Sequence, residues 1–146
     1  IEVARGKALD LDVRIDDAVP ACVIGDPTRL RQIITNLLGN ALKFTERGRI
    51  AVDVTIGDSN AEALLLALSV SDTGIGIAAE DIAHVTEPFG RGTSSIARKI
   101  EGIGLGLPIT RSLIEAHGGR LEIESEAGRG TTIRLLFPAA RARRAA

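Results

Sequence analysis

The chain has 146 residues, of which 45% are hydrophobic, and a formal net charge of −1 at neutral pH. One domain of this length can bury roughly two-thirds of the surface of its unfolded chain, and the near-neutral charge excludes electrostatic attraction to nucleic acid or an anionic membrane as its main interaction. The single cysteine, Cys22, excludes an internal disulfide and a cysteine-rich metal site, and it fits a reducing cytoplasm. Without a signal peptide or an apolar run long enough to span a bilayer, we expect a cytoplasmic domain with no direct membrane contact. Its parent protein could still be anchored through a segment outside this chain.

The first predicted elements are a strand over residues 9–15 and a long helix over about residues 26–43. Asp26 can cap this helix, and Pro27 fits the first turn, where its missing N–H costs nothing. Apolar residues recur at the i, i+3, i+4 spacing of one buried helix face. They are Leu30, Ile33, Ile34, Leu37, Leu38, Ala41 and Leu42.

Three polar side chains border this apolar face. Asn36, Asn40 and Lys43 are spaced i, i+4 and i+7, so they gather on one side of the predicted helix. One asparagine at such a position commonly makes only a structural hydrogen bond. Three polar groups in line favour a site, because amide oxygens suit Mg²⁺ and a lysine suits a phosphate.

A hairpin is predicted next, from strands over residues 50–56 and 64–70 that are joined by a turn at residues 58–60. The second strand leads into the motif Asp72-Thr73-Gly74-Ile75-Gly76-Ile77. An aspartate at a strand end beside glycines can present its carboxylate to a closely approaching ligand, such as the exocyclic amine of adenine. The alternative is an ordinary turn in which Asp72 bonds only its own backbone.

A short helix is predicted over residues 78–85, followed by a glycine- and serine-rich stretch over residues 90–106. This stretch has the composition of a lid that closes over phosphates, or of a plain surface loop. It ends in GIGLGLPIT, where Gly102, Gly104 and Gly106 precede a helical pattern. Backbone N–H groups can converge there on an anion at a helix N-terminus, although glycines also make turns and flexible loops.

The last predicted elements are a helix over residues 108–117 and a second hairpin, with strands over residues 120–125 and 131–137. The chain thus predicts a two-layer α/β sandwich, whose mixed, mostly antiparallel sheet is covered on one face by helices. Residues 1–138 would form one domain. Residues 139–146, rich in arginine and alanine, have little to bury and are expected to be disordered.

Four motifs in order carry a resemblance to a known family: NLLGNALKFT, SDTGIGI, EPFGR and GIGLGL. They resemble the N box, first glycine box, F box and second glycine box of the catalytic and ATP-binding domain of bacterial sensor histidine kinases. These kinases belong to the superfamily that also contains gyrase, chaperone and mismatch-repair ATPases. The resemblance extends from about residue 8 to Pro138, and four boxes in order are far more specific than any one of them.

The resemblance implies ATP and Mg²⁺ as cofactors and assigns roles to residues of this chain. Asn40 would chelate Mg²⁺, and Asp72 would accept a hydrogen bond from the adenine amino group. Asn36, Lys43 and Arg91 would act near the phosphates, and Phe44 would pack against adenine. Further nucleotide contacts fall on Gly74, Gly76, Ile77, Gly102, Gly104, Leu105, Gly106, Leu107 and Thr131, with Thr132 as an alternative to Thr131.

The implied reaction is transfer of the γ-phosphoryl group of Mg·ATP to a histidine on an adjoining helical dimerisation domain, with a response regulator downstream. Related ATPases carry a glutamate at the position of Asn36 to activate water, and asparagine cannot act as that base. Neither His84 nor His117 lies in a motif like the family's phosphoacceptor box, so we expect both to be structural.

Two alternatives to this kinase stay open. Thr86 replaces the usual aromatic residue of the F box, and Ile103 replaces a common threonine of the second glycine box. These departures allow a pseudokinase that senses nucleotide or docks a partner. The other alternative is a serine kinase of the anti-sigma type.

Overall fold

The structure is a computed structural model that describes residues 8–20, 23–59, 63–82 and 106–141. Its elements in chain order are β1 (Ala8–Ile15), β2 (Val23–Ile24), α2 (Pro27–Phe44), β3 (Arg47–Ser59), β4 (Ala63–Asp72), α4 (Gly106–Ala116), β5 (Arg120–Glu126) and β6 (Gly130–Arg141). Within these ranges, no helix is long and apolar enough to cross a membrane.

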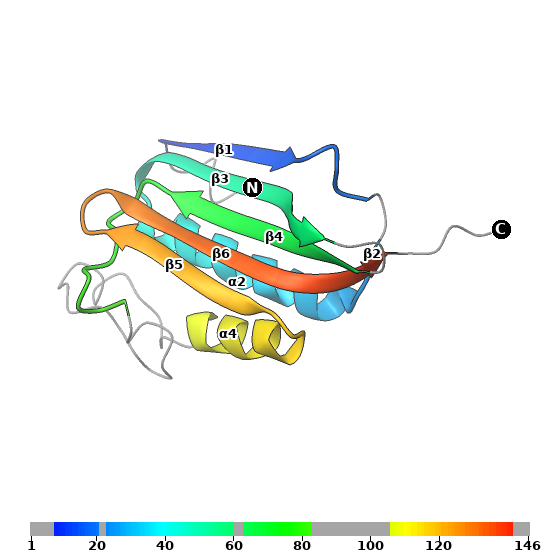
Figure 1. The fold of residues 1–146 in the computed structure, drawn as a ribbon. Coiled ribbons are helices and arrows are strands. Elements are labelled where there is room, and N and C mark those ends of the chain that lie inside the picture. The colour runs from blue at the N-terminus through cyan, green and yellow to red at the C-terminus, as the bar shows by residue number, and fades with distance from the viewer. Residues whose placement is uncertain (1–7, 21–22, 60–62, 83–105, 142–146) are drawn as a thin grey trace.

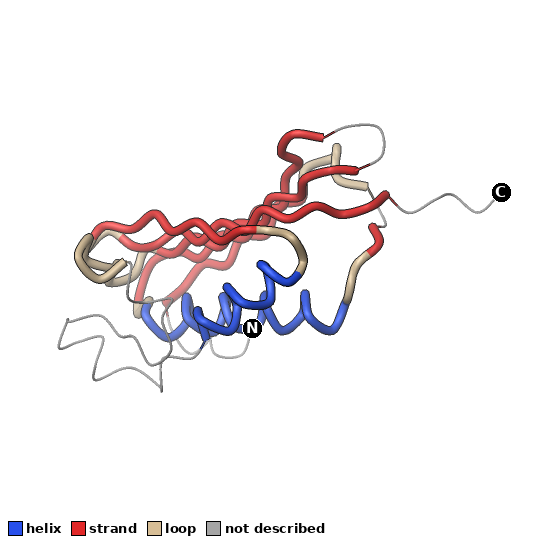
Figure 2. The backbone as a smooth tube through the Cα atoms, turned by 60° about the horizontal axis from the view of Figure 1, so that its bottom comes forward, coloured by secondary structure: helices blue, strands red, loops and turns tan. Residues whose placement is uncertain are grey.

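The strands form one six-stranded sheet in the order β1-β3-β4-β6-β2, with β5 also paired to β6. β1 runs parallel to β3, and every other pairing is antiparallel. Both α2 and α4 lie on the same face of the sheet (Figures 1 and 2), and no helix of the described residues covers the other face. The predicted two-layer α/β sandwich is therefore confirmed.

The core lies between the helices and alternate residues of the central strands. Its buried members are Ile33, Leu37, Ala41, Ile50, Val52, Leu66, Leu68, Val70, Ile114, Ile133, Leu135 and Phe137. Successive strand residues point to opposite faces, so Asp72, two residues after Val70, faces the helices. Asp53, Ser69 and Arg134 are paired in register on the open face.

Most predicted elements are confirmed. α2 begins as expected, with Asp26 Oδ1 accepting hydrogen bonds from the Thr28 and Arg29 N–H groups at 3.0 and 3.2 Å. The strand at residues 9–15 and both hairpins are also present, although β3 and β4 are longer than the apolar alternation indicates. β2 has only two residues and was not predicted.

The prediction of a disordered tail is wrong for residues 139–141, because β6 continues to Arg141. There Ala139 and Ala140 pair with β4, while Ala140 and Arg141 pair with β2. Backbone pairing on both sides orders a segment that has few apolar side chains to bury. Residues 142–146 lie outside the described ranges.

The predicted helix over residues 78–85 is described only in its first part. Residues 79–82 form a turn, in which the Asp81 N–H donates to the Ala78 carbonyl at 2.9 Å. The rest of that segment lies outside the described ranges.

Candidate active site

Three segments that are far apart in the sequence meet at one end of the sheet. The C-terminus of α2, the loop after β4 and the β5–β6 turn all lie at the left in Figure 1, and α4 begins at the same end. The Ile75 N–H donates to the Phe44 carbonyl at 3.3 Å, and the Gly128 N–H donates to the Ile75 carbonyl at 2.7 Å. The loop after β4 is therefore held between the helix end and the turn.

Glycines permit this close packing of backbone on backbone. A Cβ on Gly74 would clash with the carbonyl oxygen of Phe44, and one on Gly76 would clash with that of Glu126. Gly76 also has a φ of 70°, a conformation that favours glycine. The fold itself thus requires glycine at these two positions. That they also leave room for a nucleotide base stays a prediction.

Asp72 lies at the end of β4, and its Oδ1 accepts a hydrogen bond from the Gly74 N–H at 2.9 Å. Burial, the largest influence, raises the pKa of the Asp72 carboxyl above its ordinary value of 3.8. Hydrogen bonding, above all from the Gly74 backbone N–H, counteracts part of this rise in pKa. A carboxylate offers about four acceptor positions, so acceptor capacity remains for a ligand beside the bond from Gly74.

We expect the raised pKa of Asp72 to make the folded protein less stable as pH increases. In the unfolded chain the carboxyl releases its proton near pH 3.8, whereas in the folded protein it does so at a higher pH. The free energy of unfolding should therefore fall as pH rises from 3.8 through the folded-state pKa. Urea unfolding over this range should show that fall in the parent chain, and Asp72→Asn should remove it. An identical pH dependence in both proteins would contradict the expectation.

The polar row on α2 contains an unsatisfied donor. Within the described residues, the Asn36 Nδ2 is buried and has no hydrogen-bond partner. Leaving a buried donor unpaired costs about 1–3 kcal/mol, so this atom is available to an acceptor from outside the described residues. Asn40 and Lys43 are half-buried, one and two turns further along the helix.

Lys43 and Phe44, predicted to contact the phosphates and adenine, contact each other in this structure. The Lys43 Nζ lies 5.7 Å from the centre of the Phe44 ring, within cation–π range. Their separate roles stay predictions.

The strand register shows which of Thr131 and Thr132 lies on the same face of the sheet as Asp72. Thr131 is paired with Asp72 across β4 and β6, so both side chains lie on the helix side of the sheet. Thr132 is paired with Ser71 on the open face, where the two hydroxyl oxygens are 3.0 Å apart. Only Thr131 lies on the same face as Asp72.

Ser125, which was not predicted, joins this group. Its Oγ accepts from the Ile77 N–H at 2.7 Å, donates to the Gly130 carbonyl at 2.9 Å and lies 2.7 Å from the Thr131 Oγ1. Strand alternation in the sequence could have placed Ser125 on the helix-facing side of the sheet, because Leu121 and Ile123 precede it on the same face of the predicted strand.

Comparison with known proteins identifies the family. The family described as histidine kinase-, DNA gyrase B-, and HSP90-like ATPase matches residues 25–141. The chain belongs to this ATPase family.

Individual relatives of this ATPase domain are histidine kinases. The signal transduction histidine-protein kinase BarA of Escherichia coli K12 is 43% identical over 129 residues, which cover 88% of this chain and 14% of BarA. The chain therefore spans a small part of such a curated relative.

Two solved structures share the fold. Full-length ShkA in complex with AMPPNP matches with a TM-score of 0.81 and 31% identity, over 97% of this chain and 28% of ShkA. The mycobacterial sensor histidine kinase MprB matches with a TM-score of 0.75 and 28% identity, over 97% of this chain and 89% of that structure.

Several predicted site residues of the ATPase domain lie outside the described ranges. They are Arg91, Gly102, Gly104 and Leu105. Thr86 and Ile103, which depart from the family pattern, and His84 lie outside the described ranges as well. Gly106 begins α4, and Leu107 packs against the core. The start of α4 lies at the same end of the sheet as the loop after β4 (Figure 1), and the nucleotide contacts of these two residues stay predictions.

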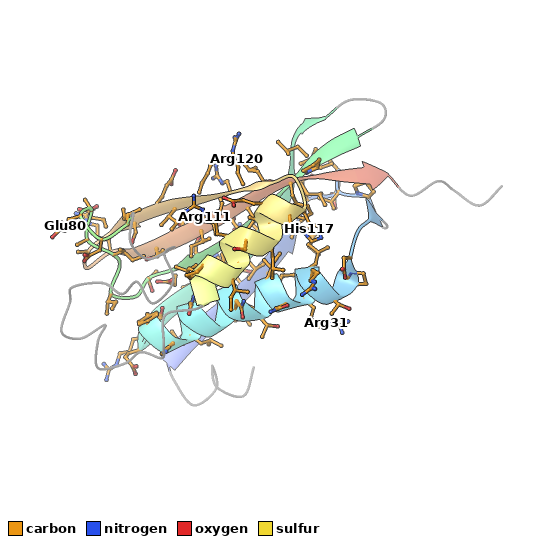
Figure 3. All side chains as sticks on the ribbon, turned by 90° about the horizontal axis from the view of Figure 1, so that it is seen from below. Arg31, Glu80, Arg111, His117 and Arg120 are labelled. Atoms are coloured by element: carbon orange, nitrogen blue, oxygen red, sulfur yellow. The ribbon has the colours of Figure 1, made fainter. Side chains whose placement is uncertain are left out.

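His117 lies at the opposite end of α4. Its Nδ1 is 2.8 Å from the Leu113 carbonyl oxygen, and Figure 3 shows it far from Glu80, which marks the site end. This position fits the structural role that the sequence indicates.

Proposed function

We propose that this chain is the ATP-binding catalytic domain of a two-component sensor histidine kinase. It transfers the γ-phosphoryl group of Mg·ATP to a histidine on an adjoining helical dimerisation domain, which then phosphorylates a response regulator. The observation that carries the proposal is the hydrogen bond between Ile75 and Phe44, which joins the loop of Asp72 to the helix of Asn36 and Asn40. Acceptor capacity on Asp72 and, within the described residues, a buried donor on Asn36 are available to a ligand.

The residues present fit a nucleotide with its metal. Asp72 accepts a hydrogen bond from the adenine amine, while Asn36 and Lys43 face the phosphates. Arg91 lies outside the described ranges, and its role near the phosphates is what the family resemblance implies. The Asn40 amide oxygen holds Mg²⁺, which neutralises charge on the phosphate oxygens when bound. Within the described residues, no group of three His, Cys, Asp or Glu side chains could hold a metal. With Asn40 as its one proposed side-chain ligand, Mg²⁺ would bind together with the nucleotide.

Phosphoryl transfer depends mainly on positioning and charge neutralisation, which such a site supplies. Asn36 cannot take a proton from water, so hydrolysis is slow and the acceptor is a side chain of another domain. His117 is bonded to its own helix at the far end of α4 and does not serve as that acceptor.

The first test of this function is calorimetric titration of the chain with ATP, with and without Mg²⁺. We expect binding that weakens when Mg²⁺ is removed, and no heat from Mg²⁺ alone. The absence of ATP binding by the folded chain would overturn the proposal.

Phosphotransfer is tested in a fusion, in which this chain replaces the matching residues of BarA behind BarA's own histidine-bearing domain. We expect an acid-labile, base-stable phosphoprotein. An acid-stable product would assign serine transfer instead. Binding without transfer, while unmodified BarA is active in the same assay, would favour the nucleotide-sensing module.

A further inference from the structure

The Ser125 hydroxyl has three polar partners, which exhaust its hydrogen-bonding capacity. A hydroxyl carries one proton and two lone pairs. The Ile77 N–H occupies one lone pair at 2.7 Å, and the proton goes to the Gly130 carbonyl oxygen, which can only accept, at 2.9 Å. The remaining lone pair is the one available to Thr131.

This count sets the direction of the bond between the two side chains. The Thr131 Oγ1 lies 2.7 Å from the Ser125 Oγ, a short hydroxyl–hydroxyl distance. Since Ser125 has no second proton to give, Thr131 must donate. The single proton of Thr131 is therefore committed to Ser125, and Thr131 can offer a ligand only lone pairs.

Thr131 and Asp72 are direct cross-strand partners on the helix-facing side of the sheet. The Gly74 backbone N–H already donates to the Asp72 Oδ1 at 2.9 Å. This corner thus presents two acceptors, a carboxylate and a hydroxyl lone pair, while its nearby donors are engaged. An exocyclic amine, with two N–H groups, matches two acceptors, whereas an oxo group at the same position meets only repulsion.

We propose that Ser125 is a positioning residue that orients the Thr131 hydroxyl, so that the site selects a purine with a 6-amino group over one with a 6-oxo group. The inference rests on the proposed nucleotide-binding function. A purely structural Ser125 would hold the loop of Ile77 to the β5–β6 turn and would influence all nucleotides alike. Selectivity between two bases, rather than affinity for one, separates these roles.

The test compares titrations with ATP and inosine triphosphate, which carry an amino and an oxo group at the same ring position. In Ser125→Ala the Thr131 proton is released and can turn toward the oxo group. We expect the ratio of ATP to inosine triphosphate affinity to fall about tenfold in this variant, and Ser125→Thr to restore it. Thr131→Val, which removes the lone pairs without changing the shape, should lower the ratio as well.

The matched control is Thr132→Val, which removes the next hydroxyl along β6, on the open face, where it lies 3.0 Å from the Ser71 hydroxyl. Its ratio should equal that of the parent chain. Thermal unfolding reports whether each variant is folded. Equal losses for both nucleotides in Ser125→Ala, or an unchanged ratio, would overturn the inference. Failure of the parent chain to bind ATP would instead overturn the proposed function and this inference with it.

Discussion

Asp72→Asn is expected to weaken ATP binding by about a hundredfold, while the protein stays folded. The carboxyl accepts from the Gly74 backbone N–H at 2.9 Å and keeps capacity for the adenine amine. An asparagine has one oxygen, so its NH₂ group must face either a backbone donor or the amine itself. Either placement sets donor against donor in a partly buried site.

The fold should survive this change, because an amide avoids the cost of burying a charge at this position. The measurement is calorimetric titration with ATP in the presence of Mg²⁺, alongside thermal unfolding. Asp53→Asn is the matched control, since Asp53 belongs to the neighbouring strand β3 but lies on the open face. Binding of ATP by Asp72→Asn with parental affinity would show that Asp72 does not contact the base.

Local signals predicted those parts of the fold whose causes are local. Asp26 and Pro27 mark the start of α2 because capping and proline geometry act within one turn. The pairing of β3 with β4 as a hairpin was predicted from the apolar alternation of both strands and the short connection between them. β2 and the end of β6 carry no such signal, since Val23–Ile24 is too short for a period and Ala139–Arg141 is not apolar enough. These segments become strands because a distant backbone lies beside them.

The candidate site divides in the same way. The spacing of Asn36, Asn40 and Lys43 is a property of one helix, and Asp72 follows one strand, so their sequence pattern was sufficient. Choosing between Thr131 and Thr132 required the register of β4 against β6, which a single strand does not reveal. Ser125 was missed because its partners, Ile77 and Thr131, belong to two other segments.

Asn40→Ala is expected to lower phosphotransfer in the BarA fusion by about a hundredfold or more, because it removes the one side chain of this domain proposed to hold Mg²⁺. Alanine is a better helix former than asparagine, so α2 should not be weakened. Gln32→Ala is the control, since Gln32 is exposed two turns earlier on the same helix and should leave the rate unchanged.

Magnesium dependence separates loss of the metal ligand from general damage. In titrations without Mg²⁺, Asn40→Ala and the parent chain should bind ATP equally, because Asp72 and the adenine corner are intact. Adding Mg²⁺ should tighten binding in the parent chain and have little effect on the variant. If Mg²⁺ tightened binding equally in both, Asn40 would not be the metal ligand, and the oxygen would have to come from another residue near the phosphates. Asn40 is half-buried beside the Asn36 Nδ2, which is buried and has no partner within the described residues. This arrangement favours Asn40 as the metal ligand, because both amides then face the ligand from one side of α2.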